Sequence, residues 1–565
     1  DAYNIAIGHS AGQAITTAVE DTVIGGLAGN SLTTGGRNTA LGYKALRQET
    51  EGNYNTAIGT EALALQNTAS NSYNTAVGYR AGYNTTTGNR NITIGGQAGF
   101  SLTTGIKNVA VGGGALYSED TGSKSVAVGN DALKHQNYDG DAYNVAVGFD
   151  AGNDITTGIQ NTLIGGLAGD ALTTGSDNVA IGLNALGLED TGSRNVAIGK
   201  SALTNQNYDG AGYNTAVGYS AGNQVTTGIQ NTIVGSLAGD ALTTGARNIA
   251  IGYSALSSED TGGRNVAIGR AALEDLNAGT DAYNIAIGYE AGKEMTTGVR
   301  NTLIGGLAGD ALTTGHYNVA IGYSALSAED AHGANVAIGY NTLASQNAGV
   351  DAYNVAVGFN SGQLISTGVQ NTLIGGQAGD ALTSANNNVA IGYNAMGSED
   401  TGDGSTAVGH SALAAMNYDG YAHNTAIGYH AGKSVTTGIQ NTILGGLTGD
   451  ALTTGSYNTT LGYGSLSVED TGSRNTAVGY EALRVQNYGG DGFNTAVGMW
   501  AGKAVTTGIS NTFLGYQAGV ALTTGSNNII IGKDAAASAV DVSNETVIGT
   551  TTTTSALVHG LKKPL

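Results

Sequence analysis

Paired carboxylates recur along the chain, and of all its residues they are the best suited to acid–base chemistry. One pair recurs in the same turn of successive blocks, as Glu119-Asp120, Glu189-Asp190, Glu259-Asp260, Glu329-Asp330, Glu399-Asp400 and Glu469-Asp470. Two carboxylates can hydrolyse a glycosidic bond when they flank the sugar at a defined separation. Adjacent residues on one narrow turn cannot take up that arrangement. We therefore predict solvated turns at these positions and no enzymatic activity.

Metal chemistry would need ligand atoms gathered in one place. Residues 137–141, Asn-Tyr-Asp-Gly-Asp, resemble a calcium-binding loop, but the equivalent residues 277–281 read Asn-Ala-Gly-Thr-Asp and do not keep the oxygen ligands. The chain has no cysteine, and its eight histidines, among them His9 and His316, form no repeated cluster with Ser, Asp or Glu. We predict no metal site and no cofactor.

All these residues are positioned by one five-residue pattern, seen at residues 74–78 as Asn-Thr-Ala-Val-Gly. The glycine of this pentad recurs 32 times, beginning with Gly8, Gly25, Gly42, Gly59 and Gly78. The spacing is thus 17, 17, 17 and then 19, and the resulting 70-residue block occurs eight times. Units this short cannot bury a core alone. A fixed period of such units indicates a solenoid, in which each coil is stabilised by its neighbours.

The pentad predicts a strand rather than a helix. Its second and fourth positions are apolar or β-branched, a small residue usually stands between them, and glycine follows as a turn. We therefore predict an all-β protein, a parallel β-solenoid with 17/17/17/19-residue coils. Coils spaced ~4.8 Å apart would give a rod on the order of 150 Å long. Residues 1–540 would form the shaft, and residues 541–565 a divergent last coil and C-terminal tail.

Asparagine opens 28 of the 32 pentads, and Asp21, Ser125, Ser405 and Glu545 are the exceptions. In stacked coils an asparagine amide can donate a hydrogen bond to one neighbouring coil and accept one from the other, so we predict a structural ladder. The predicted ladder residues include the first asparagine and the first pentad glycine of each block: Asn4, Gly8, Asn74, Gly78, Asn144, Gly148, Asn214, Gly218, Asn284, Gly288, Asn354, Gly358, Asn424, Gly428, Asn494 and Gly498.

Both faces of the predicted strand are apolar, because side chains alternate along a strand and the middle residue is alanine in most coils and large in the second coil of a block. One face can fill the coil, but the other would leave an apolar stripe too large for a soluble monomer. We expect the middle positions to face a partner chain. The candidates are Ala146, Leu163, Ala250, Leu303, Ala320 and Phe513.

Threonine and tyrosine ranks leave two alternatives open. Paired threonines such as Thr16-Thr17, stacked from coil to coil, could order water and bind ice. The third and fourth coils of each block interrupt this row of threonines, so we interpret them as turn residues. Tyrosines follow many pentad glycines, as Tyr79 and Tyr323 do. Stacked aromatic rings usually pack between coils or chains, although exposed rings could bind sugars.

Composition excludes several partners. The 565 residues carry a formal net charge of −21 without a basic patch, so nucleic acid is an improbable partner. No apolar run reaches the ~20 residues of a membrane helix, and the N-terminus lacks the features of a secretory signal. Residues 1–3 repeat at 141–143, which indicates a piece of a longer protein. The lack of cysteine fits an extracellular rod stabilised by stacking.

The motif Asn-(Val/Thr)-Ala-(Ile/Val)-Gly resembles the head repeats of trimeric autotransporter adhesins of the YadA type. The longer coils, with Gly-Tyr-x-Ala-Gly and Ala-Leu after the pentad, look still more like the shaft repeats of bacteriophage tail fibres and related bacterial surface fibres. The resemblance covers nearly the whole chain and implies a left-handed β-roll, assembled as an intertwined or side-by-side homotrimer. The adhesin heads have shorter coils, and their stalk and anchor motifs do not occur in this sequence.

From this resemblance we expect a structural fibre shaft, on a virion tail or a cell surface, that joins other fibre or baseplate proteins and positions a receptor-binding tip for host attachment. The alternative is an adhesin whose repeats bind a host glycan or receptor directly. Recognition is expected outside the regular repeats, because their most protruding turns vary between blocks. Met499 and Trp500 stand where tyrosine is common, and are the candidate binding residues.

Overall fold

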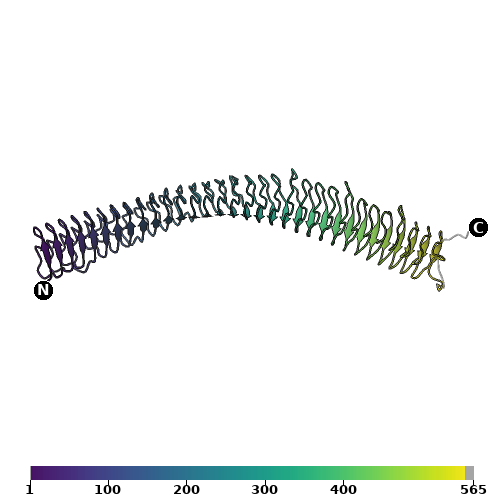
Figure 1. Ribbon diagram of the computed structural model, residues 1–565, viewed down its shortest axis with the longest axis horizontal. Coiled ribbons are helices and arrows are strands. Elements are labelled where there is room, and N and C mark those ends of the chain that lie inside the picture. Colours follow the sequence, from purple (N-terminus) through teal and green to yellow (C-terminus); the bar gives the residue numbers. More distant parts are fainter. Residues whose placement is uncertain (1, 554–565) are drawn as a thin grey trace, which may run out of the picture. The chain divides into compact units, whose positions relative to one another are not determined.

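The computed structural model describes residues 2–553, in two units that adjoin in sequence between Tyr283 and Asn284. Each unit is built from short strands and turns, and the described residues contain no helix. Every strand is formed by the middle three residues of one pentad, as the pattern of β-branched and small residues predicts. Figure 1 shows the coils of each unit stacked in the order of the sequence.

The strands of the first unit follow one another at the pentad intervals. They are β1 (Ile5–Ile7), β2 (Thr22–Ile24), β3 (Thr39–Leu41), β4 (Thr56–Ile58), β5 (Thr75–Val77), β6 (Ile92–Ile94), β7 (Val109–Val111), β8 (Val126–Val128), β9 (Val145–Val147), β10 (Thr162–Ile164), β11 (Val179–Ile181), β12 (Val196–Ile198), β13 (Thr215–Val217), β14 (Thr232–Val234), β15 (Ile249–Ile251) and β16 (Val266–Ile268).

The second unit repeats this arrangement. Its strands are β17 (Ile285–Ile287), β18 (Thr302–Ile304), β19 (Val319–Ile321), β20 (Val336–Ile338), β21 (Val355–Val357), β22 (Thr372–Ile374), β23 (Val389–Ile391), β24 (Thr406–Val408), β25 (Thr425–Ile427), β26 (Thr442–Leu444), β27 (Thr459–Leu461), β28 (Thr476–Val478), β29 (Thr495–Val497), β30 (Thr512–Leu514), β31 (Ile529–Ile531) and β32 (Thr546–Ile548).

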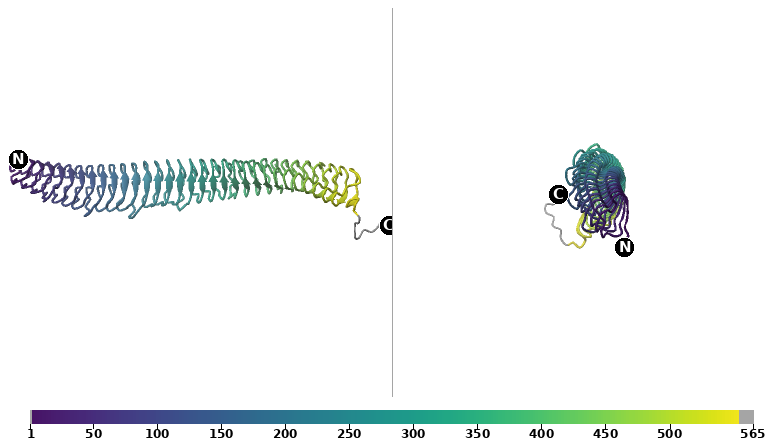
Figure 2. Two further views of the ribbon diagram at one scale, coloured as in Figure 1. Left: turned by 90° about the horizontal axis from the view of Figure 1, so that it is seen from below. Right: turned by 90° about the vertical axis from the view of Figure 1, so that its left-hand side faces the viewer.

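Within each unit, consecutive strands pair in parallel and in strict register. Leu163 of β10 lies opposite Ala180 of β11 in the next coil, and Ala197 of β12 lies opposite Ala216 of β13, across a 19-residue coil. The two additional residues of the longer coil are therefore accommodated in a turn and do not shift the register. The prediction of an all-β parallel solenoid with ~17-residue coils is confirmed, whereas its handedness and trimeric state stay predictions. Figure 2 shows the strands of the first unit, from purple to teal, side by side.

The interior of each coil is filled by residues of complementary size. The large Leu163 of β10 lies over two glycines, and a Cβ added at Gly152 or Gly169 would come within 3.0 Å of its side chain. In the next coil the sizes are exchanged, because the middle residue is Ala180 and the position equivalent to Gly169 is the buried Leu186. Close packing of this kind tolerates neither an added methyl group nor a lost one without cost.

The turns depend on backbone conformations that most residues avoid. All pentad glycines but Gly549 in the last coil have φ near that of Gly165, at +139°, a region that is essentially restricted to glycine. Other left-handed positions are occupied by ordinary residues, such as Gln160 with φ of 60° and Leu186 with φ of 54°. The stacked neighbours hold these residues in place, since a left-handed leucine has a local energetic cost.

The divergent C-terminal segment predicted for residues 541–565 still contributes a coil. Its strand β32 pairs in register with β31, so Val547 lies opposite Ile530. Glu545 takes the place of the ladder asparagine, and its backbone N–H donates to Asn528 Oδ1 at 2.9 Å. The remainder of the predicted tail, residues 554–565, lies outside the described residues.

Candidate functional site

Except in the first and last coils, the middle residues of the pentads lie inside the coil of their own chain. All six candidates for a chain–chain interface have 0 % exposure: Ala146, Leu163, Ala250, Leu303, Ala320 and Phe513. An interior side chain cannot contact a second chain while its coil stays folded. The structure therefore reverses the predicted roles of the two strand faces, because the middle residues fill the coil and their flanking neighbours point outward.

The second and fourth residues of the pentads form what we call the outer strand face. These side chains are threonine, valine, isoleucine or leucine, and they lie partly exposed from one coil to the next. In the fourth position Ile164 and Ile374 are each 39 % exposed, and Leu514 is 47 % exposed. Continuous exposed apolar surface of this kind marks an interaction site in soluble proteins. The outer strand face is thus the strongest candidate for a contact with another molecule.

The glutamates of the acidic turns are buried, so the prediction of solvated turns is wrong for them. Glu119 is fully buried; its Oε1 accepts the Gly122 N–H at 2.7 Å and its Oε2 accepts Gln136 Nε2 at 2.9 Å. Gln136 Oε1 in turn accepts Nδ2 of the ladder residue Asn144 at 2.9 Å. Burial raises the pKa of Glu119, and these hydrogen bonds partly offset that rise. The glutamate organises the turn from inside, and its carboxylate is occupied by protein donors.

One turn departs from this arrangement, and sequence reasoning missed it. In the fifth block His332 stands where six of the other blocks have a glycine such as Gly122 and the last block has Val542. Comparing the blocks position by position, rather than searching for clusters that repeat, would have found this change.

The ladder asparagines are buried and join consecutive coils. Asn161 Oδ1 accepts the backbone N–H of Asn178 at 3.0 Å, and Asn161 Nδ2 donates to the carbonyl of Gly175 at 2.9 Å. The same pair of bonds recurs along each unit, with the partners 17 and 14 residues further on. Most ladder contacts thus run from side chain to backbone, which satisfies polar groups that the closed coil has buried.

Asp21 interrupts the ladder in the second coil. Its Oδ1 accepts the Asn38 N–H at 2.8 Å, but its Oδ2 is buried without a hydrogen-bond partner. At the equivalent place Asn38 uses its Nδ2 to donate to the carbonyl of Gly52 at 3.0 Å. Burial of Asp21 raises the pKa of its carboxyl from the ordinary value of 3.8 to about 6, because the charged form is poorly solvated there.

The substitution Asp21→Asn should therefore stabilise the N-terminal coils at pH 7.5 and not at pH 3.5. A carboxyl whose pKa is raised by folding makes its full contribution to the free energy of unfolding at pH values below its unfolded pKa. That contribution is lost as the pH rises through the folded pKa of about 6. The gain at pH 7.5 is at most about 3 kcal/mol. Urea unfolding at both pH values measures it, and Asn38→Asp should introduce the same dependence on pH. If the free energies of unfolding of wild type and Asp21→Asn differ by the same amount at both pH values, this explanation is wrong.

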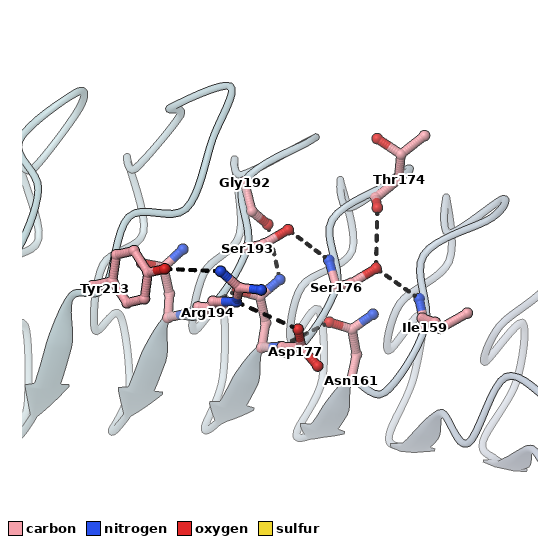
Figure 3. A network of polar contacts seen from close by, with 11 residues as sticks. Ile159, Asn161, Thr174, Ser176, Asp177, Gly192, Ser193, Arg194 and Tyr213 are labelled. Atoms are coloured by element: carbon pink, nitrogen blue, oxygen red, sulfur yellow. Dashed lines mark hydrogen bonds and ion pairs between the residues drawn. The ribbon is translucent and has the colours of Figure 1, made fainter.

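Polar side chains also connect the coils along one edge of the stack, where the chain approaches each pentad. Ser193 Oγ accepts the backbone N–H of Ser176 at 3.0 Å. Arg194 lies between two coils, with its Nε 3.7 Å from Asp177 Oδ2 and its Nη1 donating to the hydroxyl of Tyr213 at 2.8 Å. Figure 3 shows these contacts running from coil to coil. They are exposed and each adds little stability, so we assign them to the alignment of neighbouring turns.

Aromatic rings form short exposed stacks beside the strands. Tyr323, Tyr340 and Phe359 each follow a pentad glycine, and their ring centroids are 5.7 and 5.5 Å apart. About half of each ring is exposed. The rings pack against one another between consecutive coils, as expected, and their outer edges are exposed to solvent.

The first threonine of a pair donates a hydrogen bond to the backbone of the next coil. Thr156 Oγ1 donates to the carbonyl of Thr173 at 3.2 Å, and Thr173 Oγ1 donates to the carbonyl of Asp190 at 3.1 Å. Hydroxyl protons used in this way link consecutive turns. This geometry supports the turn interpretation over an ice-ordering rank.

No protein family matches the chain, and no curated protein is similar to it. Within residues 2–553, no helix is long and apolar enough to cross a membrane.

The two candidate binding residues near the C-terminal end differ in accessibility. Met499 is 39 % exposed, in the position that tyrosine takes in other coils. Trp500 is partly buried; its Nε1 donates to Glu481 Oε2 at 3.0 Å, and Lys503 Nζ lies 5.0 Å from the centroid of the indole. The indole is thus held by its own chain on two sides. A surface hollow of about 200 Å³ lies over the preceding coils; Glu481 and Arg484 are among its lining residues, and Trp500 is not.

Proposed function

We propose that the chain is the structural shaft of a phage tail fibre or similar surface fibre, assembled as a homotrimer that holds a receptor-binding tip away from its base. The observation that carries this proposal is the outer strand face, an apolar rank repeated in every coil of both units. Such a rank cannot stay in water without promoting association. Other fibre or baseplate proteins would bind at the ends, and the assembly would work outside the cell.

A partner of the same sequence fits this face best. The rank of threonine, valine and isoleucine has the same period in each copy, so the side chains of parallel copies can interdigitate along their whole length. Charged residues are concentrated in the turns rather than in the strands. With a net charge of −21 per chain, the copies would repel one another unless apolar burial at this face outweighed the repulsion. Three outer strand faces around one axis would cover each other and leave the acidic turns in water.

Lysine on the outer strand face should prevent assembly and leave the coils folded. We expect Ile164→Lys combined with Ile374→Lys, one substitution in each unit, to convert trimer to monomer, because each charge would be buried in the assembled face. Light scattering coupled to size-exclusion chromatography measures the mass, and circular dichroism checks the fold.

The matched control places lysines at apolar residues outside the strands that are more exposed than Ile164 and Ile374. Leu188 and Val350 are 54 % and 55 % exposed, and both lie in turns. Leu188→Lys with Val350→Lys should leave the mass unchanged. A wild-type chain that is monomeric at all concentrations would refute the trimer, and an outer-face variant that still assembles would place the interface elsewhere.

The second candidate function is adhesion by the repeats themselves. It is favoured by the exposed stacks of tyrosine and phenylalanine, because sugar rings bind to aromatic faces and edges, and by the surface hollow that Tyr463 and Glu481 help to line. Repetition along the chain would strengthen weak sites by avidity. Glycan binding by the chain that is lost on Tyr340→Ala would favour this function over the shaft.

A further inference from the structure

The acidic turn of the fifth block gathers three potential metal ligands that no other block has. It reads Glu329-Asp330-Ala331-His332, whereas the third block reads Glu-Asp-Thr-Gly at residues 189–192. One ligand atom from each of Glu329, Asp330 and His332 lies within 4.8 Å of the other two. The three residues stand in one turn, so their spacing depends on few backbone angles.

In the third block the glutamate has its hydrogen-bond partners. Glu189 Oε1 accepts the Gly192 N–H at 2.7 Å, and Glu189 Oε2 accepts the Tyr208 N–H at 3.3 Å. A Cβ added at Gly192 would lie only 2.4 Å from the carboxyl carbon of Glu189. Any side chain at this position must therefore displace the carboxylate from its bonds.

In the fifth block the displacement has left a buried carboxylate oxygen without a partner. The His332 N–H reaches Glu329 Oε1 only at 3.2 Å, and Glu329 Oε2 has no hydrogen-bond partner although the side chain has 0 % exposure. Nε2 of Gln346, from the next coil, is also buried without a partner. A buried charge in this condition is costly unless a cation or a donor satisfies it.

The histidine offers the matching lone pair. His332 Nδ1 is buried without a hydrogen-bond partner and lies 3.8 Å from Glu329 Oε1. One cation between the Glu329 carboxylate and this ring nitrogen can ligate both residues, and so satisfy the two groups that lack partners, Glu329 Oε2 and His332 Nδ1. Asp330 is exposed and adds a carboxylate from the solvent side, which leaves a path for an ion to enter.

We propose that Glu329, Asp330 and His332 bind one divalent transition-metal ion with the ligand preferences of zinc. An imidazole nitrogen with carboxylate oxygens suits zinc and its neighbours in the first transition row, while calcium and magnesium prefer oxygen ligands alone. Three protein ligands with water in the remaining position form a common zinc arrangement. The ion fixes this turn in place of the hydrogen bonds that the glycine turns make.

The test is titration of the full chain with zinc after removal of metal by a chelator. Calorimetry and elemental analysis should give one tightly bound zinc per chain. His332→Gly restores the turn of the other blocks, so the variant should fold as well as the wild type. We expect it to bind zinc at least tenfold more weakly, and Glu329→Gln to do the same.

A control removes a close pair of histidines away from the proposed site. The rings of His410 and His430 lie 5.4 Å apart on neighbouring coils and could bind zinc at the surface. His410→Ala with His430→Ala should keep the tight site of the wild type. The proposal is wrong if the wild type binds no zinc, if His332→Gly loses less than tenfold in affinity, or if the control variant loses the site.

Discussion

Ala250→Glu should unfold the coils around it, with a loss of about 3 kcal/mol or more in local stability. Ala250 is fully buried in β15, between Ile233 of β14 and Ala267 of β16. The glutamate would have to enter a closed coil interior that has room for a methyl group. Because stability in a solenoid is a sum over neighbouring coils, the effect should be local. Hydrogen–deuterium exchange of peptides covering about 230–270 would measure it as lost protection.

The control lies one residue away. Ile249 belongs to the same strand but points outward and is 36 % exposed, so Ile249→Glu should leave the coil folded. If the middle residues faced a partner chain, as the sequence alone had indicated, Ala250→Glu would preserve the coil and block assembly. Unchanged exchange protection in Ala250→Glu would therefore overturn the interior assignment.

The fold could be predicted because its two determinants are local and repeated. The interval between pentad glycines sets the length of a coil, and the pentad residues, such as Thr162–Ile164, suit a short strand. With both repeated throughout, parallel stacking in register is the arrangement that pairs every strand. No individual side-chain contact had to be known.

The two faces of the strand could not be told apart in this way. The side-chain period in a strand is two, so exchanging interior and exterior is a shift of one residue, and here both sets of residues are apolar. The sizes of more distant residues contain the missing information. Leu163 is matched by Gly169, and Ala180 by Leu186, within the same coils. Such an exchange of volume is expected only between residues that share one interior.

The buried glutamates were missed because some of their hydrogen-bond partners lie in the next coil, and only the others in the same turn. Carboxylates are usually exposed, and a turn sequence alone gives no reason for an exception. Glu119 accepts the backbone N–H of Tyr138, which is 19 residues later in the longer coil, at 3.3 Å. The backbone of that coil also bonds to the acidic turn, where the Ser123 N–H donates to the Gly140 carbonyl at 2.9 Å. The acidic turn therefore precedes each 19-residue coil for a structural reason, because its glutamate anchors the longer turn.

Gly95→Ala should be among the most destabilising single substitutions in the shaft, at a cost of about 3 kcal/mol or more. Gly95 follows β6 with φ of +135°, a conformation that alanine rarely adopts. A Cβ there would lie 2.4 Å from the carbonyl oxygen of Gly112 in the next coil, and a backbone atom cannot rotate away as a side chain can. The two coils would have to separate, which breaks the strand pairing between β6 and β7.

The neighbouring glycine provides the comparison. Gly96 has no left-handed φ, and a Cβ added to it would meet no atom within 4 Å. Gly96→Ala should therefore change stability by less than about 1 kcal/mol, and reduced entropy of the unfolded chain could even make it stabilising. Thermal unfolding of the two variants, with exchange protection measured over coils six and seven, separates the contributions of backbone conformation and stacking from a general effect of added volume. If both variants unfold at the same temperature, the pentad glycine is not needed for close stacking, and its recurrence in every coil requires another cause.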